Sequence, residues 1–116
     1  MKDLAALNLS PELAAKLEEA VRVIVDIARP ELVILFGSYA EGTQREDSDM
    51  DLLVVAETDS PAELTVRMRR GIRDLFRPLP LDILVYPPEA WERYRWVRGF
   101  VTRDADQKGV RLHAAG

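Results

Sequence analysis

The chain has 116 residues, no cysteine, and 16 Lys and Arg against 20 Asp and Glu, which gives a formal net charge of −4. This length fits a single domain over residues 1–116, and the lack of cysteine excludes a disulfide framework, a thiolate zinc site and a cysteine nucleophile. With no signal peptide, no apolar run of about 20 residues and a mildly acidic charge, we expect a cytoplasmic domain without direct membrane or nucleic-acid contacts.

The first half of the chain predicts one helix and two strands. Apolar residues at three- and four-residue spacing predict an amphipathic helix over 12–28, and Ser10-Pro11 supplies an N-cap followed by a first-turn proline. Five consecutive apolar residues, 32–36, are typical of a strand that is covered on both faces. We expect a polar loop over 37–48 and a second buried strand over 52–55.

The second half continues this alternation of helices and strands. Ser60-Pro61 begins a capping box, which predicts a second helix over 61–77. The remaining elements are expected to be a strand over 81–86, a helix from Pro88 to about Gly99, a helical stretch over 100–107 and a short strand over 110–112. This order predicts an α/β domain with a small mixed β-sheet that is flanked by helices.

Four arginines and three aromatic residues are interpreted as structural rather than functional. Four arginines oppose the apolar stripe of the second helix and are expected on a solvated face: Arg69, Arg70, Arg73 and Arg77. Three aromatic residues in the third helix region are expected to pack in the core or at its rim: Trp91, Tyr94 and Trp96.

Carboxylates stand at the start of two of the predicted strands. Asp49 and Asp51 lead into the second strand, and because alternate strand residues share a face, their side chains should point the same way. Two carboxylates on one face repel each other unless a cation lies between them, and oxygen ligands favour Mg²⁺ or Mn²⁺. Asp82 interrupts the third strand and has the same interpretation. A solvated strand end is the structural alternative for the pair.

The predicted topology can bring these carboxylates to a glycine turn. Gly37-Ser38 follows the first strand, so it lies near Asp49 and Asp51 if the first two strands are antiparallel. Asp82 joins them if the third strand is parallel to the second, and the helix over 61–77 is the crossover that such a pair requires. We therefore expect all five residues at one rim of the sheet.

This combination of groups suits phosphoryl or nucleotidyl transfer. Two divalent ions held by shared carboxylates can clamp the attacking and leaving oxygens of an in-line displacement. A glycine turn lets backbone N–H groups and a serine hydroxyl approach phosphate oxygens. A third carboxylate can complete a metal shell or take the proton from the attacking hydroxyl.

The motif resembles that of a known family. Gly37-Ser38, ten residues, and then Asp49-x-Asp51 is similar to the signature of the nucleotidyltransferase superfamily, which has the DNA polymerase β-like fold. The resemblance covers nearly the whole chain and is strongest to the minimal, single-domain members. It implies that Gly37 and Ser38 hold ATP, that Asp49 and Asp51 bind two Mg²⁺ ions, and that Asp82 is the third catalytic carboxylate.

The resemblance also implies a partner. Minimal members are commonly paired with a HEPN-domain ribonuclease toxin, and some act as antitoxins that transfer AMP from ATP onto a hydroxyl of the toxin. We therefore expect a hetero-oligomer with a HEPN-domain protein. Where the family often has an arginine before its second glycine, this chain has Glu41. That departure favours the alternative of a non-catalytic module that neutralises its partner by binding. A small-molecule acceptor ranks last, because the chain lacks a second acceptor-binding domain.

Overall fold

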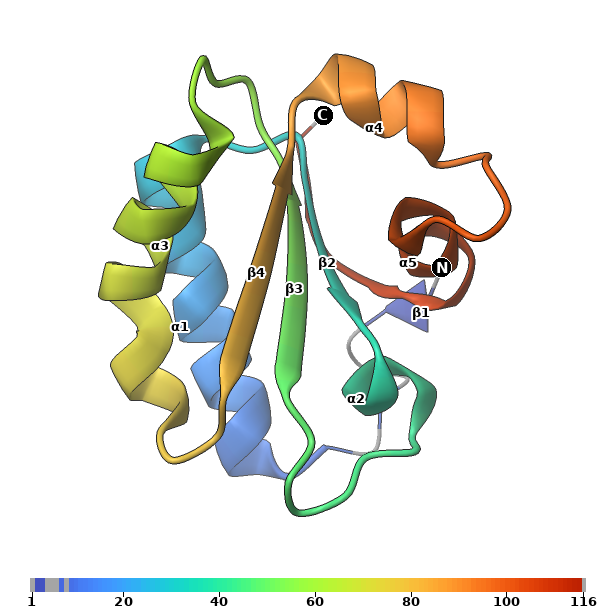
Figure 1. Ribbon diagram of the computed structural model, residues 1–116. Coiled ribbons are helices and arrows are strands. Elements are labelled where there is room, and N and C mark those ends of the chain that lie inside the picture. Colours follow the sequence, from blue (N-terminus) through green and yellow to red (C-terminus); the bar gives the residue numbers. More distant parts are fainter. Residues whose placement is uncertain (1, 4–6, 8, 116) are drawn as a thin grey trace.

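The protein folds as a mixed β-sheet with helices on both faces (Figure 1). The computed structural model describes residues 2–3, 7 and 9–115. Its elements are, in chain order, β1 (Lys2–Asp3), α1 (Pro11–Ala28), β2 (Leu32–Phe36), α2 (Ser38–Glu41), β3 (Met50–Val55), α3 (Pro61–Phe76), β4 (Leu81–Tyr86), α4 (Pro88–Tyr94), α5 (Val101–Lys108) and β5 (Val110–Ala114). The α/β class and the mixed sheet that the sequence predicts are confirmed.

Local capping explains where the two long helices begin. The Ser10 hydroxyl accepts a hydrogen bond from the backbone N–H of Leu13 at 3.1 Å, and Pro11 follows as the first helical residue of α1. In α3 the Ser60 hydroxyl accepts from the N–H of Glu63 at 3.2 Å. Each serine satisfies an amide that would otherwise have no partner in the first turn, so both helices begin where the sequence predicts.

The strand order is β1-β5-β2-β3-β4. β2 and β3 are antiparallel, β3 and β4 are parallel, and α3 is the crossover between the parallel pair. The antiparallel and the parallel pairing are those that the sequence analysis required for the carboxylates and Gly37-Ser38 to lie at one rim of the sheet. β5 pairs with β2 in antiparallel fashion and extends to Ala114, so the chain end that was expected to form a short strand is an integral part of the sheet.

Two apolar clusters lie on opposite faces of the sheet. On one face α1 and α3 pack on alternate strand residues such as Leu35, Leu52 and Val54. On the other face Trp91 of α4 and Ala105 of α5 pack on the intervening residues, including Leu53. Figure 1 shows α1 and α3 on one side of the strands and α4 and α5 on the other. None of the helices in the described part of the chain is long and apolar enough to span a membrane.

The segment between β2 and β3 differs from the sequence prediction. Residues 37–48 were expected to form a loop, but Ser38–Glu41 form the short helix α2, which is closed by Gly42 in the left-handed conformation. The buried side chain of Ala40 packs against the larger cluster and holds this turn on the protein. β3 also begins two residues earlier than expected, so Asp51 is a residue of the strand itself.

Candidate functional site

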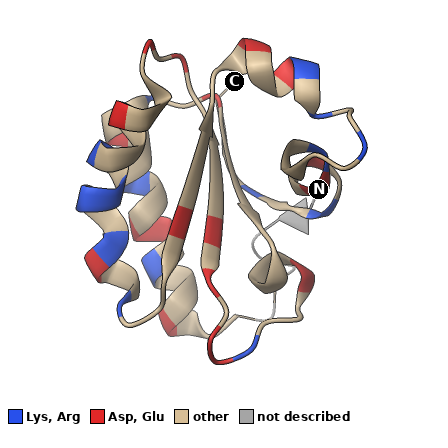
Figure 2. Ribbon diagram, viewed as in Figure 1, with Lys and Arg blue, Asp and Glu red and all other residues tan. Residues whose placement is uncertain are grey.

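Two carboxylates occupy matching positions on neighbouring strands. Asp51 of β3 is in register with Asp82 of β4 on one side and with Phe36 of β2 on the other. In Figure 2 the acidic positions of β3 and β4 lie side by side in the sheet. Because Leu53 and Val55 belong to the α4/α5 cluster, strand alternation places Asp51 on that same face. The sequence prediction that these two carboxylates meet is confirmed by the register.

Gly37 lies directly against Asp51. Its φ of +76° is in a region that other residues rarely adopt, and a β-carbon there would come within 2.3 Å of the Asp51 Oδ2 atom. Its carbonyl accepts hydrogen bonds from the N–H groups of Ala40 and Glu41, both at 3.1 Å. The glycine therefore serves two purposes, because it turns the chain into α2 and leaves room for the carboxylate.

Ser38 is the first residue of α2 and is half-buried. Its carbonyl accepts a hydrogen bond from the N–H of Thr43 at 3.0 Å, which helps to close the turn. Ser38 follows Gly37 directly, so the predicted phosphate-binding pair lies beside Asp51 at the end of β2. Glu41 is the last residue of α2 and is exposed, as is Arg45 in the following loop.

Asp49 precedes β3 and is exposed. The pKa of Asp51 is raised to about 6. Burial is the largest cause, followed by the charge of Asp82 and then by that of Asp49, so Asp49 also acts on Asp51. Among residues 2–3, 7 and 9–115, no group of three or more Asp, Glu or His side chains lies close enough to hold a metal ion by itself. Asp51 and Asp82 thus form a pair, and Asp49 contributes from the adjoining loop.

The carboxylates fit a divalent cation by their chemistry. Burial and the charges of Asp82 and Asp49 make the ionised form of Asp51 costly in the absence of a cation. A bound cation would remove that cost, and the donors are all oxygen atoms, the type that Mg²⁺ selects. The raised pKa of Asp51 is the observation that supports this fit.

Arg69 contacts this site from α3, and the sequence analysis did not identify it. Its guanidinium donates a hydrogen bond to the carbonyl of Leu81 at 2.6 Å and lies 3.9 Å from Oδ1 of Asp82. It was expected on a solvated helix face with Arg70, Arg73 and Arg77, and its side chain is indeed 39% exposed, but it also reaches β4. Its position directly after buried Met68 was the available signal, since it borders the buried side of the helix.

A hollow of about 510 Å³ lies at the opposite end of the same face of the sheet. It is lined by Leu32, Val55, Trp91, Glu92, Arg111 and neighbouring residues of the chain end. Leu32 and Val55 are paired with each other at the far end of β2 and β3 from Asp51. This hollow contains none of the predicted site residues, so it is separate from the candidate site.

Comparison with known proteins places the chain in a family. The family model described as a nucleotidyltransferase domain matches residues 15–111, which include all five predicted site residues. A comparison with curated protein sequences gives no match.

Three solved structures share the fold. A toxin–antitoxin structure with AMP-PNP has 22% identity and a TM-score of 0.54, and the match covers 84% of this chain and 73% of that one. A variant of the toxin–antitoxin pair MntA-HpeT, with two aspartates changed to glutamates, has 18% identity and a TM-score of 0.59 at the same coverage. A candidate nucleotidyltransferase from Sulfolobus solfataricus has 16% identity and a TM-score of 0.52, covering 92% of this chain and 91% of that one.

Proposed function

The chain belongs to the nucleotidyltransferase domain family, and on that basis we propose that it transfers AMP from ATP to a hydroxyl of a partner protein. The observation that carries this proposal is the pairing of Asp51 with Asp82 directly beside Gly37. The proposed unit is the single domain of residues 1–116, acting in the cytoplasm. The proposed partner is a HEPN-domain toxin, which would make this chain its antitoxin.

Each of the predicted site residues has its own role in the proposed reaction. Asp49, Asp51 and Asp82 would hold Mg²⁺, with two ions proposed, and the bound metal would neutralise the triphosphate and the leaving pyrophosphate. Backbone N–H groups at Gly37 and the Ser38 hydroxyl would bind phosphate oxygens. The acceptor oxygen bonds to the α-phosphorus, pyrophosphate leaves with the other bonding pair, and a carboxylate oxygen of Asp82 takes the hydroxyl proton.

Two similar structures support a protein as acceptor. One is a toxin–antitoxin structure with AMP-PNP, and another carries a pair of aspartate-to-glutamate changes in MntA-HpeT. The changed aspartates of that protein are two positions apart, as Asp49 and Asp51 are here.

Intact mass spectrometry tests the proposal. The chain is incubated with ATP, Mg²⁺ and a HEPN-domain protein of the proposed toxin class. We expect the partner to gain the mass of one or more AMP groups, and the gain to disappear with Asp49→Asn or Asp51→Asn. Partner labelling that is equal with wild type and Asp51→Asn would show that these carboxylates are not the machinery.

A non-catalytic binding module is the second candidate, and Glu41 is the observation that favours it. The side chain is exposed on α2 beside the proposed triphosphate position, where its negative charge opposes a phosphate. A binding module would still neutralise the partner after Asp49 and Asp51 are both changed to Asn, whereas the transferase would not. Glu41→Arg sharpens the distinction, because it should raise the transfer rate if Glu41 weakens triphosphate binding and should leave pure binding unchanged.

A further inference from the structure

Exposed apolar side chains gather in one short segment between α4 and α5. Large hydrophobic residues that are exposed in the described part of the chain number five, and four of them lie within six residues: Trp96, Val97, Phe100 and Val101. Trp96 is 63% exposed, although the sequence predicted that it packs in the core or at its rim. The fifth, Val66, lies alone on α3. We call residues 96–101 the apolar loop.

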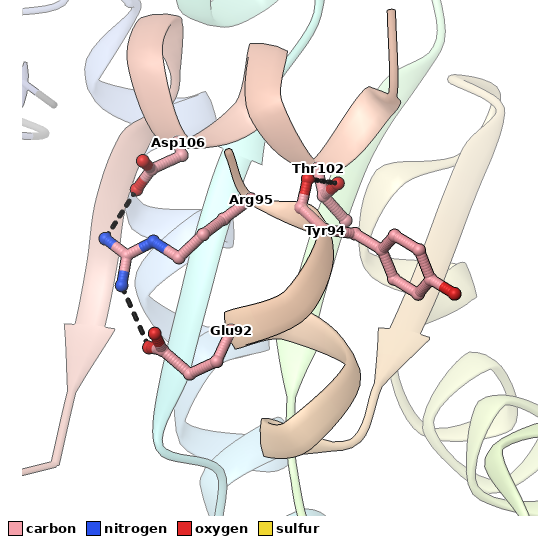
Figure 3. Close-up of polar contacts among 5 residues, drawn as sticks. All are labelled: Glu92, Tyr94, Arg95, Thr102 and Asp106. Carbon is pink, nitrogen blue, oxygen red and sulfur yellow. Dashed lines mark hydrogen bonds and ion pairs between the residues drawn. The ribbon is translucent and has the colours of Figure 1, made fainter. Parts of the chain in front are cut away.

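The apolar loop is held in place at both ends (Figure 3). The rings of Tyr94 and Phe100 stack with centroids 5.1 Å apart, and the Thr102 hydroxyl donates to the Tyr94 carbonyl at 2.8 Å. Arg95 donates to Asp106 of α5 and to Glu92 of α4, each at 3.0 Å. A loop fixed in this way has already lost much of the conformational entropy that binding would cost, so its exposed residues are prepared for contact.

The segment around the apolar loop carries positive charge that is only partly balanced. Residues 91–103 contain four arginines and one glutamate, but Glu89 pairs with Arg93 and Asp106 pairs with Arg95, so the charge not already paired is that of Arg98 and Arg103. Arg95 is already paired, and its guanidinium also lies 4.7 Å from the centre of the Trp96 ring. Arg98 and Arg103 have no ion-pair partner within 4.0 Å among the described residues. Two arginines are therefore available to an acidic ligand.

We infer that the apolar loop docks a partner protein through a segment that presents apolar side chains flanked by Asp or Glu. Trp96 and Val97 supply the apolar contact, and Arg98 supplies the complementary charge. A second copy fits poorly, because a two-fold contact would oppose arginine to arginine and a head-to-tail contact would need a different, acidic and apolar surface on the other copy. A nucleic acid is less suited, because Arg95 covers one face of the Trp96 ring and the Phe100 ring is already stacked on Tyr94.

The position of the apolar loop connects docking with the proposed reaction. α4 and α5 lie on the face of the sheet that carries Asp51 and Asp82 (Figure 1). A partner bound at residues 96–101 therefore lies on the same side of the sheet as the carboxylates, where it can offer a hydroxyl. This extension rests on the proposed transfer to a protein, whereas docking itself needs no catalysis.

Binding is measured by calorimetry between the full chain and a HEPN-domain protein of the proposed toxin class, without ATP. We expect Trp96→Ser/Val97→Ser to weaken binding at least tenfold. Arg98→Glu should weaken it about tenfold at low salt and should reduce its dependence on salt. Val66→Ser is the matched apolar control and Arg70→Glu the matched charge control, both on α3, and each should leave the affinity within twofold. Circular dichroism and melting curves check that every variant folds.

The outcomes separate docking from catalysis. Binding by wild type that is lost with Trp96→Ser/Val97→Ser but kept with Asp51→Asn supports the docking surface, even if no AMP is transferred. Equal affinity of wild type and Trp96→Ser/Val97→Ser, or no binding by wild type, overturns it. If the wild-type chain self-associates and Trp96→Ser/Val97→Ser abolishes that self-association, the surface joins copies of this chain and the inferred partner is wrong.

Discussion

The two faces of the sheet are covered to very different extents. On one face α1 and α3, with 18 and 16 residues, run along the strands and close a cluster of sixteen buried residues. On the other face α4 and α5, with seven and eight residues, close a cluster of five. Both counts refer to the described part of the chain. The short helices cover this face incompletely: Asp51 is only half-buried at one end, and a hollow lies at the opposite end.

This difference separates stability from chemistry. A carboxylate under a long helix would lose its hydration without any compensation, which is very costly. On the incompletely covered face Asp51 is only half-buried, so its pKa rises to about 6 while the ionised form stays accessible near neutral pH. The α1/α3 face can therefore supply most of the folding energy, and the α4/α5 face can tolerate the repulsion that a metal site requires in the absence of its metal.

The largest expected effect on stability comes from the α1/α3 face. Ile24 of α1 is fully buried in the larger cluster, so Ile24→Ala should cost about 3 kcal/mol in the free energy of unfolding. Leu84→Ala, at a half-buried position in the smaller cluster, should cost about 1 kcal/mol. Urea denaturation of both variants measures the difference. Equal costs would contradict the unequal contributions of the two faces.

The next effect is expected at the turn beside Asp51. Gly37→Ala introduces both a strained φ and a clash with Oδ2 of Asp51, and should cost about 2–3 kcal/mol while lowering any transfer activity, because the carboxylate must move. Gly42→Ala is the matched control, since Gly42 has a φ of +77° and nothing within 4 Å of an added β-carbon. It should cost about 1 kcal/mol from strain alone. Denaturation midpoints give both values, and identical costs would show that Asp51 yields freely.

The smallest expected effect is a gain in the free energy of unfolding when the charge of Asp51 is removed. Its folded-state pKa of about 6 exceeds the ordinary value of 3.8, so the folded state binds the proton more tightly than the unfolded chain. The stabilising contribution of protonated Asp51 to the free energy of unfolding is therefore full below about pH 4 and is lost as the pH rises through 6. At pH 7.5 without metal, Asp51→Asn should be more stable than wild type by about 1 kcal/mol after allowance for solvent screening.

Melting curves of wild type and Asp51→Asn across pH 4 to 8 provide that measurement. The two proteins should approach each other toward pH 4, where Asp51 is protonated in the folded state and becomes increasingly protonated in the unfolded wild type. Added Mg²⁺ should raise the melting temperature of wild type more than that of the variant, because binding to the folded state stabilises it. A variant that is less stable than wild type at pH 7.5 would contradict the raised pKa.

The sequence predicted the elements whose signals are local. Ser10 and Ser60 cap helices where the pattern indicates, and the crossover rule correctly made β4 parallel to β3. The adjacency of Asp51 and Asp82 follows from this topology, so this part of the site was predictable. The roles in binding metal and nucleotide stay predictions for all five residues: Gly37, Ser38, Asp49, Asp51 and Asp82.

Features that depend on distant packing were not predictable in the same way. α2 has only four residues, and buried Ala40 fixes it through contacts that no short pattern encodes. β5 and β2 are paired although they lie far apart in the sequence, and a short apolar segment does not indicate which strand it will pair with. The exposure of Trp96 also depends on how the α4–α5 connection leaves the sheet, whereas hydrophobicity alone favours burial.

The contact between Arg69 and Leu81 also affects the exposed edge of the sheet. β4 is the last strand of the sheet, so its outer backbone groups could pair with a strand of another molecule. The Pro80 carbonyl accepts from Met50 of β3, and since successive carbonyls alternate in direction, that of Leu81 faces the outer edge. Arg69 occupies this carbonyl, and Asp82 places a charge at the next residue. Arg69 and Asp82, which lie at the proposed reaction site, therefore also make the outer edge of the six-residue strand β4 less able to pair with a strand of another molecule.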